Sequence, residues 1–141
     1  MDGIRVGFEI KNIYTGERGI LAHINQSDGP MLGKYRVNLN SLSEIGAFSI
    51  DSALESADLI AVDEVGPMEL YSNSFKVALK RAVESKKLML CTIHAKTRDP
   101  LIDYIKSRKD AALFEATLNN RENLHSQIIV MVIEILKLKT T

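Results

Sequence analysis

The most constraining feature of the sequence is an alternation of helix-like and strand-like segments that begins near residue 49. Residues 58–62 and 88–93 form largely apolar runs of strand length, and residues 72–83 between them space their apolar side chains as one face of a helix does. Such runs are typical of strands that are covered on both faces and joined by crossover helices. The pattern therefore predicts an α/β fold with a mostly parallel sheet.

Further segments extend this arrangement toward both ends of the chain. Residues 111–114 predict a third parallel strand, and residues 124–136 carry an apolar stripe that predicts a final helix packed on the core. The Asp99-Pro100 pair opens a helix before that strand, with proline at its favoured first position. Ahead of the parallel part, alternation in residues 6–10 and 20–24 around a turn predicts an N-terminal β-hairpin.

The chain has no internal repeat, low-complexity tract or linker that would divide it. Residues 35–37 predict a further short strand and residues 49–56 a short helix. A chain of 141 residues is within the usual size of one domain. We therefore expect residues 1–141 to form a single α/β domain.

Composition and charge exclude several classes of protein. With 18 Lys+Arg and 18 Asp+Glu the formal net charge is 0, so the chain lacks the basic excess that drives sequence-independent nucleic-acid binding. The longest aliphatic run, residues 128–133, is far shorter than a membrane span. The single cysteine, Cys91, cannot form an intramolecular disulfide, which favours a reducing, cytoplasmic setting. We expect no membrane contact and no dedicated nucleic-acid surface.

Asp63 and Glu64 are the polar pair best placed for chemistry, because they follow a buried strand directly. Ligands of parallel α/β sheets bind at the carboxyl ends of the strands. A carboxylate at this edge can hold Mg²⁺, and a second one can orient and deprotonate an attacking water. Acidic residues are also common at solvated strand ends, so the pair alone leaves both interpretations open.

The residues around this pair resemble those of a known family. Residues 58–70 (Asp-Leu-Ile-Ala-Val-Asp-Glu-Val-Gly-Pro-Met-Glu-Leu) are similar to the Walker B segment of the THEP-type nucleoside-triphosphatases, a small family of P-loop NTPases. The Gly-x-Arg-x-Gly-Phe pattern of residues 3–8 and the Gly-Lys-Tyr pattern of residues 33–35 resemble further family segments. Residues 92–94 and 117–122 also match, so the resemblance extends in order from near residue 3 to the last helix.

The resemblance implies a fold and an activity. The fold would be the Rossmann-like P-loop NTPase three-layer sandwich with an N-terminal β-hairpin. The activity would be Mg²⁺-dependent hydrolysis of nucleoside triphosphates such as ATP or GTP to the diphosphate and phosphate. Asp63 would hold the metal and Glu64 would activate water. Thr92 and His94 close the next strand, and Asn120 and Arg121 open the last helix, so these four would contact the nucleotide or serve local structural roles.

One part of the family pattern has no counterpart in the sequence. The family begins with a strand, a Gly-rich phosphate-binding loop (the P-loop) and a helix, all before the hairpin with which this chain opens. We therefore expect the isolated chain to be inactive or very weak as an enzyme. We also expect possible self-association through the part of the sheet that the P-loop unit would cover.

Two alternatives of other classes remain open at this stage. The chain could be a non-hydrolytic interaction or regulatory module of the same fold that lacks the P-loop. It could also be an unrelated Mg²⁺-dependent phosphohydrolase that uses Asp63, for which Lys96 is the nearest basic candidate.

Overall fold

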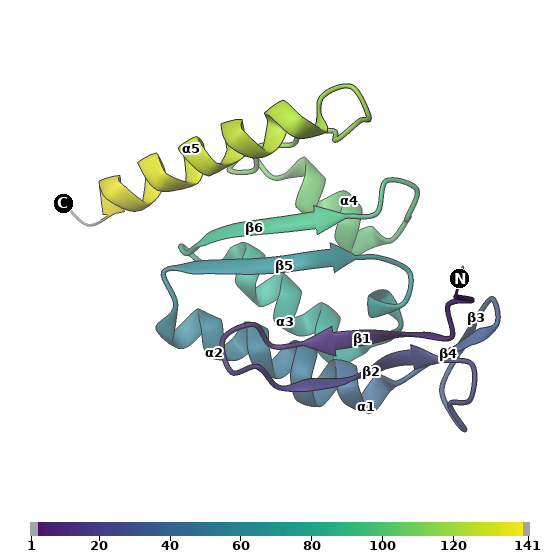
Figure 1. The fold of residues 1–141 in the computed structure, drawn as a ribbon. Helices are drawn as coiled ribbons and strands as arrows, with labels where there is room; N and C mark the ends of the chain where they lie inside the picture. Colours follow the sequence, from purple (N-terminus) through teal and green to yellow (C-terminus); the bar gives the residue numbers. More distant parts are fainter. Residues whose placement is uncertain (1–2, 140–141) are drawn as a thin grey trace.

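The computed structural model describes residues 3–139 (Figure 1). Its strands are β1 (Gly7–Lys11), β2 (Arg18–His23), β3 (Met31–Leu32), β4 (Tyr35–Val37), β5 (Leu59–Val65) and β6 (Leu88–Ile93). Its α-helices are α1 (Leu39–Ser41), α2 (Phe48–Ser56), α3 (Asn73–Glu84), α4 (Pro100–Ser107) and α5 (Arg121–Lys139). A π-helical segment, η1 (Leu42–Ala47), joins α1 to α2, and a 3₁₀ turn, η2 (Glu69–Tyr71), precedes α3.

The strands form two sheets of different type. β1, β2, β4 and β3 are neighbours in this order in an antiparallel sheet, whereas β5 and β6 pair in parallel. The predicted hairpin and the short strand at residues 35–37 are confirmed. The prediction of a mostly parallel sheet is not confirmed for residues 3–139. The pairs β1–β2 and β3–β4 are each joined by a short turn, which favours antiparallel pairing, and β2 also pairs antiparallel with β4.

The predicted third parallel strand is also absent from the part of the chain described. Residues 111–114 lie in an irregular segment, with Leu113 65% and Phe114 42% exposed. An apolar run forms a strand only where a neighbouring strand can take its backbone hydrogen bonds. No strand in residues 3–139 pairs with this segment, so its apolar composition does not make it a strand.

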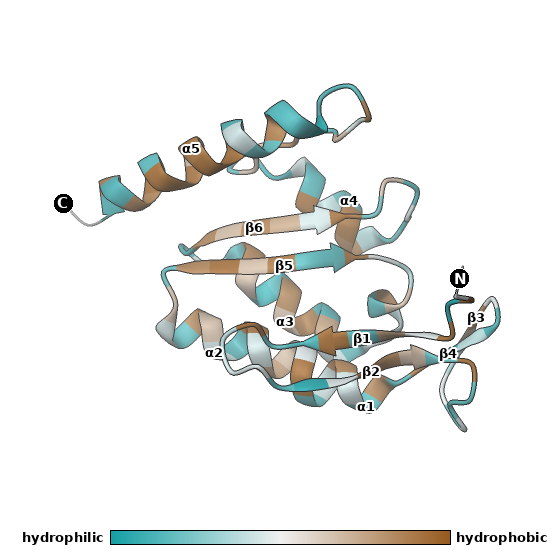
Figure 2. Cartoon of the chain, in the orientation of Figure 1, coloured by the Kyte–Doolittle hydropathy of each residue, from teal (hydrophilic) through white to brown (hydrophobic). Residues whose placement is uncertain are grey.

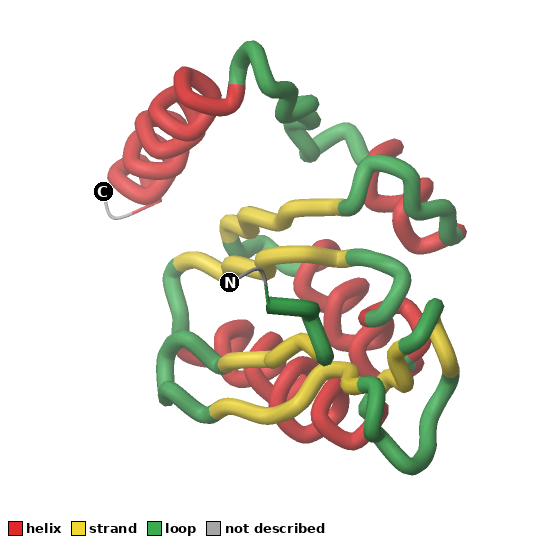
Figure 3. Tube along the Cα trace, turned by 45° about the vertical axis from the view of Figure 1, so that its right-hand side comes forward, coloured by secondary structure: helices red, strands yellow, loops and turns green. Residues whose placement is uncertain are grey.

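The core lies between the sheets and the helices α2 and α3, which cover one side of both sheets (Figures 1 and 3). The helical spacing on α3 buries Phe75, Ala78, Leu79 and Ala82. Ser72 caps this helix by accepting a hydrogen bond from the Phe75 amide at 3.2 Å, a role in which serine is common.

The start of α4 also follows the sequence pattern. The Asp99 side chain accepts a hydrogen bond from the Leu101 amide at 2.9 Å, and Pro100 occupies the first turn. The Lys76 ammonium lies 2.7 Å from the Asp99 carboxylate and ties α4 to α3. Burial raises the pKa of Asp99, but the hydrogen bonds from Lys76 and Leu101 together outweigh it and leave this pKa below its usual value.

The final helix forms as predicted, but its apolar stripe is not part of the core. α5 lies beyond the outer edge of β6, and none of its residues is buried. Its apolar middle turns are visible in Figure 2 as a brown band. Ile129, Val130 and Ile133 are 52%, 54% and 46% exposed. No helix within residues 3–139 is both long and apolar enough to cross a membrane.

Candidate active site at the ends of β5 and β6

Asp63 and Glu64 form a bulge near the carboxyl end of β5. Val62 faces Cys91 and Val65 faces Ile93 on β6, so the two acidic residues together stand opposite the single residue Thr92. Glu64 has a φ of 75°, the left-handed region that residues with a side chain rarely adopt. The bulge breaks the strict alternation of faces, and both acidic side chains are exposed.

The Thr92 hydroxyl holds this bulge together. It donates a hydrogen bond to Asp63 Oδ1 and accepts one from the Glu64 backbone N–H, each at 2.7 Å. The extra residue of a bulge leaves a backbone group without a ladder partner, and Thr92 supplies that partner for Glu64. The sequence leaves both a nucleotide contact and a local structural role open for Thr92, and the structure shows its hydroxyl bonded to the two acidic residues.

Glu69 lies behind this pair and was missed as a functional residue by sequence reasoning. Its side chain is buried, and Oε2 accepts a hydrogen bond from the Gly66 backbone N–H at 2.9 Å. Burial raises the pKa of the Glu69 carboxyl, the Glu69 and Gly66 backbone hydrogen bonds partly oppose this, and the negative charge of Glu64 raises it further. The sequence feature that could have indicated Glu69 is its position three residues after Gly66, the glycine of the Asp-Glu-x-Gly segment.

His94 follows β6 at the same edge of the sheet. Its backbone N–H donates to the Val65 carbonyl at 3.0 Å, which continues the pairing of β5 and β6. Its ring Nδ1 accepts from the Lys96 amide at 3.4 Å, and the residue is exposed. The structure thus brings Asp63, Glu64, Thr92 and His94 to one sheet edge, as the sequence predicts.

Asn120 and Arg121 are not brought into this group. The Asn120 side chain accepts from the Thr117 amide at 2.7 Å and donates to the Glu115 carbonyl at 2.8 Å, so it orders the loop before α5. The Arg121 side chain is exposed and makes no hydrogen bond or ion pair within residues 3–139. In this structure their contacts are local ones.

The nearby cysteine is not a reactive thiol. Burial, assisted by the negative charge of Asp63, raises the pKa of Cys91 to about 12. A thiol must ionise to act as a nucleophile. Cys91 therefore packs as a small apolar residue of β6.

Asp63 is the residue best suited to hold a metal. Among residues 3–139, no three His, Cys, Asp or Glu side chains converge on one point. Mg²⁺ in nucleotide-hydrolysing enzymes is usually held by one or two carboxylates together with waters and substrate phosphates. An exposed carboxylate whose Oδ2 has no partner in the described chain fits this donor set.

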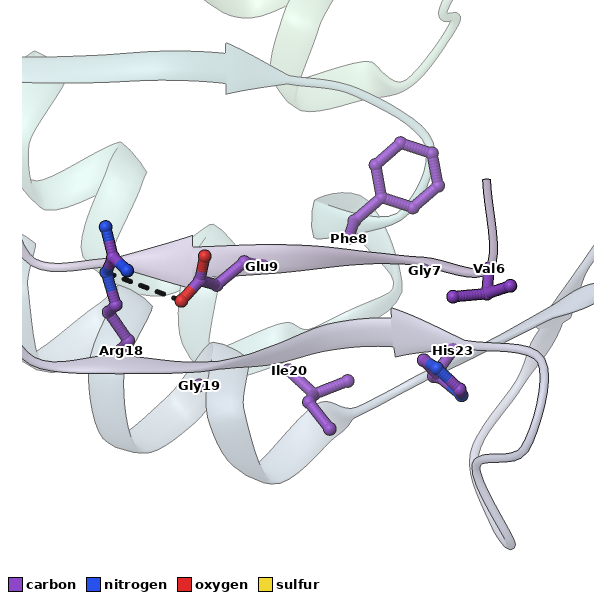
Figure 4. A pocket seen from close by; sticks show the side chains of 8 residues that line it. All are labelled: Val6, Gly7, Phe8, Glu9, Arg18, Gly19, Ile20 and His23. Atoms are coloured by element: carbon purple, nitrogen blue, oxygen red, sulfur yellow. Dashed lines mark ion pairs between the residues drawn. The ribbon is translucent and has the colours of Figure 1, made fainter. Parts of the chain in front are cut away.

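A hollow of about 400 Å³ lies elsewhere, on the outer face of the β1–β2 hairpin (Figure 4). It is shallow and largely apolar, and the Glu9–Arg18 ion pair at 3.4 Å crosses it. Asp63, Glu64 and Thr92 do not line this hollow, so it is separate from the candidate active site.

Comparisons with known proteins show which family the chain resembles. Residues 1–129 match the family model described as NTPase. Nucleoside-triphosphatase THEP1 of Methanosarcina acetivorans is 42% identical over 127 residues, which are 90% of this chain and 70% of that relative. Nucleoside-triphosphatase THEP1 of Thermotoga maritima is 41% identical over 125 residues, or 89% of this chain and 71% of that one.

A solved structure shares the fold. The crystal structure of THEP1 from the hyperthermophile Aquifex aeolicus superposes with a TM-score of 0.82 at 26% identity, and the match covers 90% of this chain and 77% of that one. The mixed α/β fold is therefore that of a P-loop NTPase relative. The chain belongs to the NTPase family of nucleoside-triphosphatases.

Proposed function

We propose that this protein hydrolyses nucleoside triphosphates, ATP and GTP among them, to the diphosphate and phosphate in the presence of Mg²⁺. The observation that carries the proposal is the bulge at the end of β5, where Thr92 bonds both the Asp63 carboxylate and the Glu64 amide. The family membership and the relatives named nucleoside-triphosphatase support it.

Each acidic residue has a separate task in this reaction. Glu64 accepts a proton from the attacking water, while its backbone is fixed by Thr92. Asp63 would hold Mg²⁺ through its free oxygen, and the metal when bound neutralises charge on the phosphates. His94, on the same edge, would orient water or contact phosphate. Arg121, which the described chain does not bring into this group, is proposed as a nucleotide contact on the family resemblance alone.

The phosphate-binding unit of the family has its proposed place between β6 and α5. Among residues 3–139, β6 has a strand neighbour on one side only. Across its open edge lie the unpaired residues 111–114 and the unburied helix α5. A strand, P-loop and helix in this gap would pair with β6 and cover α5, and would complete the three-layer sandwich.

The experiment compares two proteins with MgATP and MgGTP. One is this chain, and the other is this chain joined to the strand–loop–helix segment of the Methanosarcina acetivorans relative. We expect steady phosphate release by the joined protein, weak or no release by this chain alone, and loss of release in the joined Glu64→Gln variant. Glu55→Gln, an exposed acid on α2, is the matched control. A joined protein whose phosphate release is absent or indifferent to Glu64→Gln would overturn the proposal.

A second candidate is a non-hydrolytic interaction module of the same fold. The open edge of β6 and the exposed apolar residues of α5 favour it, because such surfaces promote association. This candidate expects self-association of this chain in light scattering and no binding of MgATP in calorimetry. Micromolar binding of MgATP would exclude it.

The proposed setting is cytoplasmic. The supporting observation is that the single cysteine, Cys91, is a free thiol, and proteins without disulfides are typical of reducing compartments.

A further inference from the structure

We infer that Glu69 is a positioning residue for hydrolysis, which fixes the turn after β5 and thereby the direction of the Glu64 carboxylate. The inference rests on the proposed function in so far as Glu64 is the base. Glu69 itself reaches Glu64 through Gly66 and is not assigned a contact with the substrate.

The first support is the unusual burial of the Glu69 side chain. Within residues 3–139 the buried polar or charged residues are Asn12, Glu69 and Ser72. Asn12 accepts from the Tyr14 and Thr15 amides in the hairpin turn, and Ser72 caps α3. Glu69 is the ionisable member of the three, at 8% exposed, and its carboxylate bonds the Gly66 amide. Burying a carboxyl costs free energy unless the group is hydrogen-bonded, so the group to which Glu69 is hydrogen-bonded indicates its role.

The second support is the crowding around Gly66. A Cβ atom built on Gly66 would lie 3.3 Å from Glu69 Oε2, 3.8 Å from Glu64 Cγ and 3.7 Å from His94 Cβ. Three side chains of the site therefore lie close to this one glycine. The Glu69 carboxyl is the nearest of the three to this position.

The third support is the backbone of Glu64. Glu64 sits at a φ of 75°, one residue before Val65, whose carbonyl bonds the His94 amide. Such a conformation persists only where the surrounding contacts over-determine it. Thr92 accepts a hydrogen bond from the amide of Glu64, and Glu69 accepts one from the amide of Gly66. Together they fix the chain before and after the side chain of the base.

The test uses Glu69→Ala and Glu69→Gln in the full chain. Glutamine keeps an acceptor for the Gly66 amide, whereas alanine removes it. In amide NMR spectra we expect Glu69→Ala to move the Glu64 and Gly66 resonances and to speed hydrogen exchange at Gly66, and Glu69→Gln to leave both near wild type. Glu55→Ala on α2 is the control. A Glu69→Ala variant that folds and keeps the wild-type Glu64 and Gly66 resonances overturns the inference.

Kinetics of the joined protein separate positioning from stability. We expect Glu69→Ala to lower kcat about 10- to 100-fold with KM unchanged, the scale of a misplaced catalytic group, and Glu69→Gln to restore most of it. A variant with a lower melting temperature but an unchanged kcat overturns the role in hydrolysis. Failure of the proposed function gives a different result. In that case the joined protein without substitutions releases no phosphate, while the amide spectra still show whether Glu69 positions Glu64 and Gly66.

Discussion

The end of β5 and the surface between β6 and α5 differ in the contacts that their side chains make. At the end of β5, hydrogen bonds of 2.7–2.9 Å link Thr92 to Asp63 and Glu64, and Glu69 to Gly66. Across the edge of β6, large apolar side chains such as Leu113 and Val130 are 65% and 54% exposed. The first region is specified by short-range polar contacts within the described chain. The second region has apolar side chains that no other part of the described chain covers. We therefore expect substitutions at the end of β5 to affect turnover and stability more than substitutions on α5 do.

The largest effect is expected for Glu64→Gln in the joined protein. Glutamine keeps the size of the side chain but cannot accept the proton of the attacking water. We expect kcat to fall about 10²- to 10⁴-fold, the usual contribution of a general base, while binding of MgATP is retained. Single-turnover phosphate release and calorimetry measure the two quantities. A kcat within a factor of two or so of wild type would assign the base elsewhere.

A smaller effect is expected when the Thr92 bridge is removed. Thr92→Val keeps the shape but leaves the Glu64 amide and Asp63 Oδ1 without their hydroxyl partner. We expect a loss of about 1–2 kcal/mol in the free energy of unfolding, as for one or two ordinary hydrogen bonds, together with reduced turnover. Urea denaturation checks the stability. Thr92→Ser keeps the hydroxyl and should restore both properties, and if it does not, the bridge is not their source.

The elements that sequence patterns predict correctly are those whose rules are local. The hairpin, α3, β5 and β6 follow from residue spacing and from the turn residues of the hairpin. Residues 111–114 have the same apolar character as β6 but no strand partner in the described chain. Strand formation depends on such a partner, and apolar spacing alone cannot report whether one is present.

The candidate site is predictable in its residues but not in its geometry. The position of Asp63 and Glu64 after an apolar run indicates their sheet edge. The bulge opposite Thr92 depends on the register with β6, which nothing in the sequence of β5 specifies. The role of Glu69 depends on a turn that brings its carboxyl to the Gly66 amide, and an acidic residue in a loop is ordinarily exposed.

The burial of Glu69 also predicts a pH dependence of stability. Because the pKa of Glu69 is raised above its ordinary value of 4.5, the folded state binds its proton more tightly than the unfolded state. The protonated Glu69 carboxyl therefore stabilises the folded state. This contribution to the free energy of unfolding is fully present below about pH 4.5 and is lost as pH rises through the raised pKa. Urea midpoints of wild type and Glu69→Gln should therefore diverge over this window, with wild type losing stability relative to the variant. A constant difference, or a gain by wild type, would contradict the assigned burial.

The smallest effect is expected on α5. Val130 is 54% exposed, so Val130→Gln should change the free energy of unfolding by no more than about 0.5 kcal/mol, whereas truncating the fully buried Leu79 to Ala should cost about 2–5 kcal/mol. Urea denaturation of dilute protein measures both. A loss above about 1 kcal/mol for Val130→Gln would show that this face of α5 is covered in solution. Light scattering then tests whether a second copy of the chain covers this face. If it does, the loss of stability in Val130→Gln also depends on protein concentration, whereas a contact within one chain gives no such dependence.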